Sequence, residues 1–245
     1  MKAVILAGGK GTRLAPYTTV FPKPLLPVGG IPILETILKQ LKAHEFEEVI
    51  LACGYLSSLI RLYFDQNPIS FGLKIRYHQE HQPLGTAGAL GSIPDLGENT
   101  LVMNGDLLTT LNFGDLMRVH RESEAHLTVA VVTKKVQVEM GVLTIDQDDR
   151  IAKYTEKPTL EFSGSAGIYA YNHKVLGLIE RDKYLDVPDL VRCLIASGYR
   201  VSAYRSDAFW LDMGTREDYE RAEQEFNSRR EAFLAGPEHR GPPGG

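Results

Sequence analysis

A glycine-rich segment directly follows the first apolar run of the chain. Residues Leu6–Leu14 read LAGGKGTRL, at the end of the apolar run Lys2–Ala7 (KAVILA). Glycines lack a Cβ, so their backbone N–H groups can close around phosphate oxygens. The guanidinium of Arg13 can hold a phosphate through two parallel hydrogen bonds. The segment therefore predicts a phosphate-binding loop at the end of a buried strand.

Two familiar glycine motifs do not describe this loop. The P-loop requires GxxxxGK[ST], and Gly8-Gly9-Lys10-Gly11 differs from it in spacing and in order. The dinucleotide fingerprint GxGxxG requires a third glycine at the position of Leu14. Neither P-loop nor Rossmann dinucleotide binding is therefore predicted.

Asp106 is the first candidate metal ligand. It ends the segment Leu101–Asp106 (LVMNGD), in which an apolar strand reaches the carboxyl edge of the predicted sheet. A single carboxylate in this place is the usual anchor for Mg²⁺ when phosphates and waters supply the other ligands. The acidic group Asp146, Asp148 and Asp149 is instead interpreted as a hairpin turn, because turns favour these residue types.

Strands alternate with helices in the first two-thirds of the chain. Continuous apolar runs predict buried strands, and apolar residues at helical spacing predict helices. The predicted strands are Lys2–Ala7, Glu48–Ala52, Leu73–Tyr77 and Thr100–Asn104, and the predicted helices are Pro32–His44, Leu56–Asp65, Thr86–Gly91 and Asp115–Glu122. This alternation predicts an α/β fold with a doubly wound, mostly parallel sheet.

The pattern changes after about residue 126 because strands then follow one another closely. Strands are predicted at Leu127–Val132, Gly141–Ile145, Ile151–Thr155 and Ala166–Tyr171, and helices at Pro188–Ser197 and Thr215–Asn227. The last helix opens with a capping-box-like pair, Thr215 and Asp218. We predict a single domain over residues 1–228 and a flexible tail over 229–245, whose end is rich in Gly and Pro.

Composition limits the classes of partner. The 245 residues carry a net charge of −4, so the basic footprint of a nucleic-acid-binding protein is absent. The N-terminus runs straight into a short strand and shows no signal peptide or membrane span, so we expect a cytoplasmic protein without a membrane partner. Cys53 and Cys193 are interpreted as buried thiols in a reducing compartment.

Two segments together resemble the signature of the sugar-phosphate nucleotidylyltransferases. LAGGKGTRLAPYT, from Leu6 to Thr18, is followed by PKPLLPV at Pro22–Val28. The resemblance implies a Rossmann-like nucleotidyltransferase fold with a nucleotide-binding half over about 1–125 and a sugar-binding half, with a small β-hairpin, over about 126–228. It also implies that a nucleoside triphosphate reacts with a sugar 1-phosphate, releasing pyrophosphate.

The same resemblance implies roles for individual residues. Arg13, Lys23 and Asp106 would be catalytic, with Arg13 and Lys23 neutralising the departing β and γ phosphates. Asp106 and Asp212, the latter in Phe209–Thr215 (FWLDMGT), would hold the Mg²⁺ cofactor. The implied nucleotide-binding residues are Leu6, Ala7, Gly8, Gly9, Gly11, Thr12, Glu80, Pro83, Gly85, Thr86, Asn104 and Gly105.

Glu80 bears on the choice of base. In the family a segment like Glu80–Leu90 (EHQPLGTAGAL) wraps the nucleobase, and members that use UTP or dTTP typically carry Gln where this chain has Glu80. A carboxylate only accepts hydrogen bonds, which suits the adjacent N1–H and amine of guanine. An unmatched buried polar group costs about 1–3 kcal/mol. We therefore favour GTP, with uridylyl or thymidylyl transfer as the alternative.

The sugar-binding residues are implied by a second pair of motifs. Tyr154–Pro158 (YTEKP) places Glu156 on sugar hydroxyls and Lys157 on the sugar phosphate, and Gly141, Ser165 and Gly167 complete the set. Relatives usually have Asn at the position of Ser165 and often Tyr at the position of Met140, so the identity of the sugar stays open. Short chains of this kind resemble guanylyltransferases for mannose, heptose or amino-sugar 1-phosphates.

Three further expectations follow. A homodimer is plausible for the family. The chain ends in a Gly/Pro tail where long relatives continue into a β-helix, so no acyltransferase domain is expected. Two other functions are alternatives. The first is a glycosyltransferase, but such enzymes usually centre on a DxD motif, which Asn104-Gly105-Asp106 does not provide. The second is a regulatory subunit that binds a nucleotide sugar without catalysis.

Overall fold

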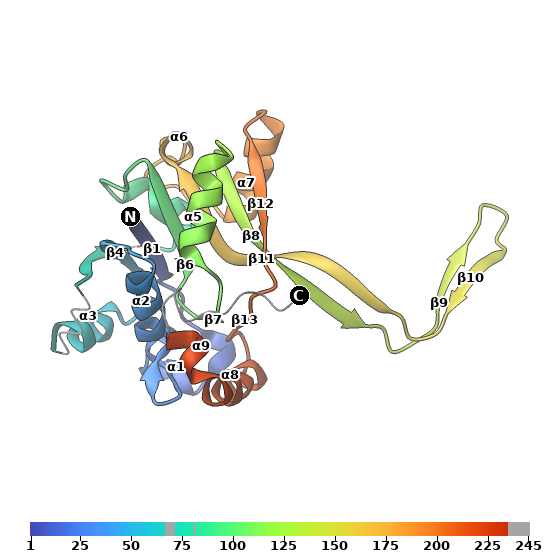
Figure 1. Cartoon of the computed structure of the whole chain (residues 1–245), viewed down its shortest axis with the longest axis horizontal. Coiled ribbons are helices and arrows are strands. Elements are labelled where there is room, and N and C mark those ends of the chain that lie inside the picture. Colours follow the sequence, from blue (N-terminus) through green and yellow to red (C-terminus); the bar gives the residue numbers. More distant parts are fainter. Residues whose placement is uncertain (67–71, 81, 235–245) are drawn as a thin grey trace.

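Strand β1 (Lys2–Ala7) lies inside a seven-stranded sheet that is buried on both faces (Figure 1). The computed structural model describes residues 1–66, 72–80 and 82–234. Ile5 belongs to the buried cluster on one face and Val4 to the cluster on the other, because successive side chains of a strand point to opposite faces. This double burial explains the continuous apolar run at the start of the chain.

The elements that follow alternate along the described chain. The strands are β2 (Pro27–Val28), β3 (Ile31–Pro32), β4 (Glu48–Cys53), β5 (Lys74–Gln79), β6 (Asn99–Asn104), β7 (Leu107–Thr109), β8 (Leu127–Gln137), β9 (Val142–Ile145), β10 (Ile151–Thr155), β11 (Thr159–Asn172), β12 (Val201–Arg205) and β13 (Trp210–Asp212). The α-helices are α1 (Tyr17–Val20), α2 (Ile33–Ala43), α3 (Ser57–Gln66), α4 (Gly85–Gly88), α5 (Phe113–Glu122), α6 (His173–Leu176), α7 (Val187–Ala196), α8 (Arg216–Ser228) and α9 (Arg230–Leu234), with short 3₁₀ turns at Thr12–Leu14, Lys23–Leu25 and Ala89–Ser92.

The sheet order is β12-β8-β11-β6-β1-β4-β5. β1 pairs in parallel with β4 and β6, β4 with β5, and β8 with β12, whereas β11 runs antiparallel to β6 and β8. The predicted mostly parallel, mixed sheet is therefore confirmed. The strand order reverses beside β1, and open α/β sheets bind ligands outside the carboxyl ends of strands at such a point.

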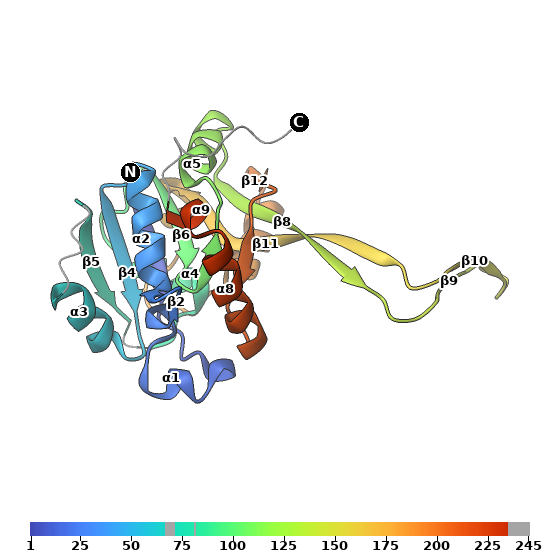
Figure 2. The same cartoon turned by 60° about the horizontal axis from the view of Figure 1, so that its bottom comes forward.

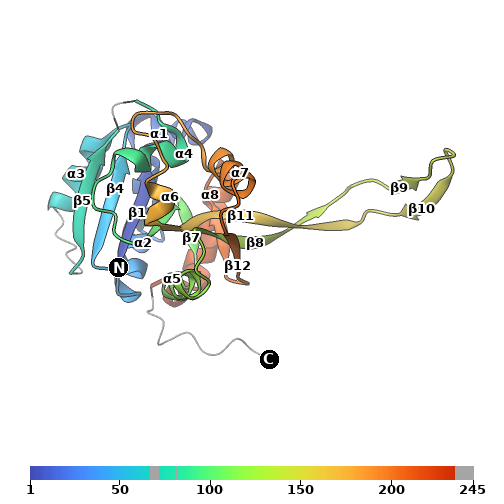
Figure 3. The same ribbon diagram turned by 90° about the horizontal axis from the view of Figure 1, so that it is seen from above.

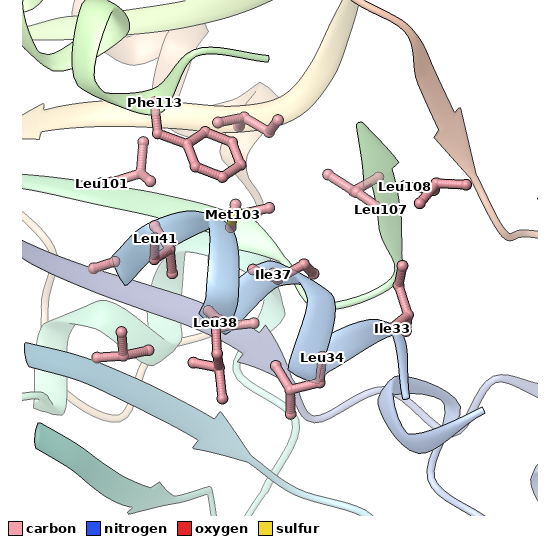
Figure 4. Close-up of a cluster of buried hydrophobic side chains, with 14 of the residues drawn as sticks. Ile33, Leu34, Ile37, Leu38, Leu41, Leu101, Met103, Leu107, Leu108 and Phe113 are labelled. Carbon is pink, nitrogen blue, oxygen red and sulfur yellow. The ribbon is translucent and has the colours of Figure 1, made fainter. Parts of the chain in front are cut away.

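Helices cover both faces of this sheet (Figure 2). Buried residues of α2, α5 and α8 belong to the cluster on one face, and those of α4, α6 and α7 belong to the other. Figure 4 shows the first cluster, where Ile37 and Leu41 of α2 lie beside Met103 of β6 and Phe113 of α5. The sheet is doubly wound, as predicted. Among the described helices, none is long and apolar enough to cross a membrane.

Helix α8 begins at the predicted capping box. The hydroxyl of Thr215 accepts a hydrogen bond from the backbone N–H of Asp218 (3.2 Å), and the carboxylate of Asp218 accepts one from the backbone N–H of Thr215 (3.1 Å). Two backbone donors that lack a partner within the helix are thereby satisfied. The start of the helix also follows Asp212 closely, so the cap helps to position a candidate site residue.

We expect Thr215→Ala to lower the free energy of unfolding by about 1 kcal/mol, because it removes the acceptor for one end of the helix. Urea unfolding followed by circular dichroism measures the change. Asn227→Ala, on the exposed side of the same helix, is the matched control and should change stability by less than about 0.5 kcal/mol. Equal losses in the two variants would contradict the role of the cap.

The C-terminal boundary of the domain differs from the prediction. A flexible tail was expected over 229–245, but Arg230–Leu234 forms helix α9. Phe233 is fully buried, and its ring stacks on Phe226 at a centroid distance of 5.5 Å. The tail prediction rested on the glycines and prolines that begin at Gly236, and the helix-forming residues before them pack on the core instead. Residues 235–245 lie outside the described residues.

One cysteine also differs from the prediction. Cys53 is buried at the end of β4, whereas Cys193 is exposed on α7. The neighbours of Cys193 are apolar because α7 is amphipathic: Leu190 and Leu194 face the core, whereas Arg192 and Cys193 are exposed. An apolar neighbourhood in sequence was therefore not a sign of burial at this position.

Strands β8 and β11 are much longer than predicted and leave the body of the molecule. Their inner halves lie in the sheet, but their outer halves are exposed. Residues 133–164, here called the arm, form a two-stranded ribbon that ends in the hairpin of β9 and β10. The arm projects beyond the body in all three views (Figures 1, 2 and 3). The predicted hairpin exists, but the ribbon places it away from the sheet.

Candidate active site

The glycine loop after β1 opens a pocket of about 280 Å³ at the carboxyl edge of the sheet. A 3₁₀ turn follows the loop at Thr12–Leu14 and directs Arg13 to the pocket. Lys23 reaches it from a second turn, Lys23–Leu25. The pocket is lined by Leu6, Ala7, Gly9, Gly11, Thr12, Arg13, Lys23, Pro24, Gly105, Asp106 and Gly214. Two cationic side chains and a glycine-rich backbone suit this pocket to a polyanion.

Lys23 is a buried cation held between two carboxylates. Only 8% of the residue is exposed. Its ammonium donates a hydrogen bond to Oδ2 of Asp106 and lies 3.7 Å from Oδ1 of Asp212. The residue looked like a loop lysine in the sequence, where only the family resemblance gave it a role. Tertiary packing makes it the counter-ion of both candidate metal ligands.

Asp106 and Asp212 each keep a buried oxygen without a hydrogen-bond partner. The oxygen is Oδ1 in both residues. Burial and the neighbouring charge of Asp106 raise the pKa of Asp212, while Lys23 and Arg13 oppose that rise. Two partly buried carboxylates around one ammonium need positive charge beside them. The predicted pair of acidic residues, far apart in sequence, is therefore brought together at one point.

Strand pairing explains how Asp212 reaches Asp106. Short strand β13 ends at Asp212 and pairs antiparallel with β7, in which Leu107 lies opposite Asp212. The backbone N–H of Met213 also donates to the carbonyl oxygen of Asp106 at 3.2 Å. Neither short strand was predicted, because three residues carry too little periodicity to be recognised.

A larger cleft of about 630 Å³ lies beside the anion pocket and shares Leu6, Gly9 and Asp106 with it. Glu80 enters this cleft from the end of β5, where its backbone N–H donates to the carbonyl oxygen of Cys53 at 2.8 Å. A Cβ on Gly8 would lie 2.9 Å from Oε1 of Glu80, so the carboxylate lies directly against the glycine loop. Burial raises the pKa of Glu80, and a hydrogen bond from the backbone of Leu84 lowers it by a smaller amount.

The rest of the cleft wall comes from the predicted base-reading segment and from two residues that sequence reasoning missed. Pro83, Gly85, Thr86 and Asn104 line the cleft, as do Gly54 and Tyr55, which follow β4. Gly54 lies at the carboxyl end of a predicted strand, the same signal that marked Asp106. This position at the end of a strand is the one sequence feature that could have identified Gly54 as a residue of the cleft.

Residues that are distant in sequence, Leu185 and Asp186, hold the segment at Gly85 and Thr86 in place. Gly85 has φ +77°, and a Cβ there would lie 2.6 Å from the carbonyl oxygen of Leu185. The carboxylate of Asp186 accepts hydrogen bonds from the backbone N–H of Thr86 (3.0 Å) and from its hydroxyl (3.2 Å). Only glycine suits that backbone conformation at so close an approach. Asp186 therefore positions the cleft wall, a role that the sequence did not reveal.

Two of the predicted sugar-binding residues lie near the middle of β11, where the strand enters the body of the molecule. A Cβ on Gly167 would lie 2.7 Å from Nδ2 of Asn104, so the strand passes directly beside the cleft. Ser165 precedes it by two residues, and its hydroxyl lies 3.0 Å from the hydroxyl of Tyr169. These two residues belong to the neighbourhood of the predicted nucleotide-binding residues.

The other three predicted sugar-binding residues lie on the arm. Gly141 packs against Tyr154, whose hydroxyl donates to Glu156 at 2.8 Å, and both Glu156 and Lys157 are exposed. Figure 3 shows the β9–β10 hairpin well clear of the body. The described structure thus does not bring these residues to the cleft of their own chain.

Comparison with known proteins agrees with this fold. The sequence profile of the nucleotidyl transferase family matches residues 2–229. Over 227 residues the chain is 34% identical to mannose-1-phosphate guanylyltransferase of Mycobacterium tuberculosis, with 89% of this chain and 62% of that protein covered. It is 33% identical to UTP–glucose-1-phosphate uridylyltransferase of Synechocystis, with 89% and 61% covered. The chain thus spans about three-fifths of the length of these relatives.

The fold also matches that of a solved structure. The crystal structure of HddC from Yersinia pseudotuberculosis in complex with GMP-PN superposes with a TM-score of 0.70 at 26% identity, covering 92% of this chain and 99% of that one. The anion pocket and the larger cleft beside it both lie at the carboxyl edge of the doubly wound sheet. The chain belongs to the nucleotidyl transferase family.

Proposed function

We propose that this protein transfers a nucleoside monophosphate, GMP in preference to others, from a nucleoside triphosphate to a sugar 1-phosphate. The products are a nucleoside-diphosphate sugar and pyrophosphate. The observation that carries the proposal is the buried Lys23, held between Asp106 and Asp212 beside Arg13 and the glycine loop. Such a group of charges suits a reaction in which two polyanions must be brought together.

The reaction requires no covalent intermediate on the protein. An oxygen of the sugar 1-phosphate attacks the α-phosphorus in line, a new P–O bond forms, and the bond to the bridging oxygen of the leaving pyrophosphate breaks. Arg13 and Lys23 neutralise the β and γ phosphates as charge accumulates on them. Backbone N–H groups of the glycine loop orient the triphosphate. Catalysis then consists mainly of alignment and charge neutralisation.

Asp106 and Asp212 would hold Mg²⁺. The fit rests on their two buried carboxylate oxygens without hydrogen-bond partners and on the preference of Mg²⁺ for one or two carboxylates, with phosphates and waters completing its shell. No cluster of three or more His, Cys, Asp or Glu side chains that would form an all-protein site occurs within the described residues. Bound there, the ion supplies charge neutralisation at the phosphates.

GTP is the favoured nucleotide because the carboxylate of Glu80 lines the cleft. It can accept hydrogen bonds from the N1–H and the amine of guanine, whereas the O4 of uracil or thymine would meet a lone pair. Mannose 1-phosphate is the first sugar to try, because a relative at 34% identity bears the name mannose-1-phosphate guanylyltransferase. Uridylyl transfer is the alternative, because a relative of nearly equal identity bears that name.

The testing experiment measures pyrophosphate release with Mg²⁺, crossing four nucleoside triphosphates with hexose, hexosamine and heptose 1-phosphates. Release with GTP and one sugar supports the whole proposal. Release with UTP or dTTP alone keeps the reaction and contradicts the base. Tight binding of a nucleotide sugar without release from any pair would favour a regulatory role instead.

We expect Glu80→Gln to shift the ratio of kcat/KM for GTP over UTP toward UTP by about 10- to 100-fold, the range set by one unmatched buried polar group. The amide both donates and accepts, so it can pair with uracil. Glu80→Ala is the matched control: it should lower activity with GTP without raising activity with UTP. An equal loss with every base in Glu80→Gln would show that Glu80 does not read the base.

A further inference from the structure

The arm carries an unusual share of the apolar surface. Of the sixteen large hydrophobic side chains exposed within the described residues, nine lie on the arm: Val136, Met140, Val142, Leu143, Ile145, Ile151, Tyr154, Leu160 and Phe162. An isolated two-stranded ribbon is marginally stable in water, and contiguous exposed apolar surface marks an interaction site. The arm therefore requires a partner.

The ribbon of the arm has one apolar and one polar face. Directly opposite residues of an antiparallel pair point to the same face. Leu160 lies opposite Val136, and Phe162 lies two residues further along the same face, which is apolar except for Lys134 opposite Phe162. On the other face, Lys135 and Glu161 are opposite each other and form an ion pair of 2.7 Å. The partner covers one face only.

The hairpin at the tip continues this pattern. Tyr154 lies opposite Leu143, and Ile151 lies opposite Ile145. Leu143 and Ile145 are two residues apart on one strand, so they share a face. The four side chains are 43–63% exposed. Beyond the hairpin, Glu156 and Lys157 lie in the bend between β10 and β11, and both are exposed.

The ribbon keeps the tip away from the cleft of its own chain. The pairing of β11 with β8 continues without a shift from Ser165 opposite Val131 to Thr159 opposite Gln137. The arm is thus a continuous ladder of backbone hydrogen bonds, and the register shift in this strand pair lies at its base, between Ser165 and Tyr169. Reaching another molecule requires no change, because the arm already projects outward in every view (Figures 1, 2 and 3).

The mouth of the cleft offers an apolar surface that would receive the arm. Tyr17, Val20 and Phe21, in and just after α1, are 44–63% exposed. α1 is tied to the residues of the site: the hydroxyl of Thr18 donates to the carbonyl oxygen of Gly11 at 2.7 Å, and that of Tyr55 donates to the carbonyl oxygen of Thr19 at 2.9 Å. Gly11 lines the anion pocket and Tyr55 the cleft.

We propose that the arm docks on a second copy of this chain and carries Glu156 and Lys157 to that copy's cleft, so that each sugar-nucleotide site is built from two chains. The proposal rests on the proposed function, since these two exposed residues need a cleft that their own chain does not bring to them. A two-fold pair in which each copy donates one arm and receives another closes symmetrically, without leaving an arm uncovered.

Complementation between two variants tests the shared site. Lys157→Ala disables the arm, and Asp106→Asn disables the cleft, so each variant alone should keep about 1% of wild-type pyrophosphate release. The two chains carry different tags, exchange subunits, and are purified as the mixed pair. In that pair the intact cleft of one chain receives the intact arm of the other. One of two sites is restored, so we expect about half of the wild-type activity.

The reciprocal pair is the matched control. Here the double variant Lys157→Ala/Asp106→Asn is paired with the wild-type chain. A shared site predicts almost no activity, because the wild-type cleft receives a disabled arm. A site within one chain predicts the opposite in both experiments, namely no rescue in the first pair and half activity in the second. That result overturns the proposal while leaving the reaction itself intact.

The docking is also tested without any activity. Light scattering should give the wild-type protein twice the mass of the 27.2 kDa chain. Leu143→Lys/Ile151→Lys should convert it to a single chain, whereas Thr144→Lys, on the opposite face of β9, should not. A wild-type protein that is a single chain, or one whose pair survives the double substitution, overturns the proposal. If the wild-type protein releases no pyrophosphate, the proposed function fails separately, and the mass alone decides whether the arm joins two copies.

Discussion

Asp106→Asn is expected to lower kcat/KM for pyrophosphate release by about 10²- to 10³-fold, the range observed when one electrostatic contact to a transition state is removed. The carboxylate contacts Lys23, and its buried Oδ1 has no hydrogen-bond partner. Asparagine keeps the shape of the side chain and loses the charge. Steady-state kinetics with saturating Mg²⁺ and the best substrate pair measures the loss.

A measurement of thermal stability distinguishes this loss of catalysis from misfolding. The charge of Asp106 raises the pKa of Asp212, so without Mg²⁺ its removal relieves repulsion while Lys23 stays beside Asp212. The midpoint of thermal unfolding should therefore be unchanged or higher without metal, and the rise on adding Mg²⁺ and GTP should shrink. Asp95→Asn, in an exposed loop, is the control for charge alone. Activity within threefold of wild type in Asp106→Asn would contradict the assignment.

Lys23→Met is the second variant with a large expected effect, and it should damage both activity and folding. It removes a cation from the leaving pyrophosphate, for which we expect a loss of about 10²-fold or more in kcat/KM. It also leaves two partly buried carboxylates without their counter-ion. Breaking a fully buried pair costs about 3–5 kcal/mol. Because 39% of the Asp212 side chain is exposed, solvent screening reduces the expected cost to about 2–3 kcal/mol.

A double-mutant cycle distinguishes the two roles of Lys23. In Lys23→Met/Asp106→Asn one unpaired carboxylate is gone, so urea unfolding should show less destabilisation than the sum of the single variants predicts. Activity should not recover, because neither group is present for the substrate. Strictly additive stabilities would mean that the ion pair between Lys23 and Asp106 contributes nothing to the fold.

Local patterns predicted most of the sheet but misjudged its edges. The strands at Lys2–Ala7, Glu48–Ala52 and Thr100–Asn104 were recognised because burial on both faces makes them continuously apolar. The outer half of β11 was missed, because Thr159–Ser165 mixes apolar and charged residues in the way that loops often do. β12 was also missed, because its exposed edge position leaves it with little apolar periodicity.

In the candidate site, too, some residues could be recognised from the sequence and others could not. The glycine loop, Arg13, Glu80 and Asp106 all stand directly at the ends of recognisable strands, where chain order alone brings them to one edge of the sheet. Asp186 and Gly54 were missed. Asp186 acts through hydrogen bonds to Thr86, a hundred residues away in sequence, and no spacing rule detects such a contact.

By itself the sequence determined the class of fold, the phosphate-binding loop and the strand-end residues, because periodicity and turn chemistry act over a few neighbouring residues. Only the tertiary structure decided that Lys23 is the buried counter-ion of Asp106 and Asp212, and that Glu156 and Lys157 lie on a projecting arm. These features depend on which distant segments pack together and how far two paired strands continue beyond the sheet. Such choices are set by the energy of the whole chain rather than by any local pattern.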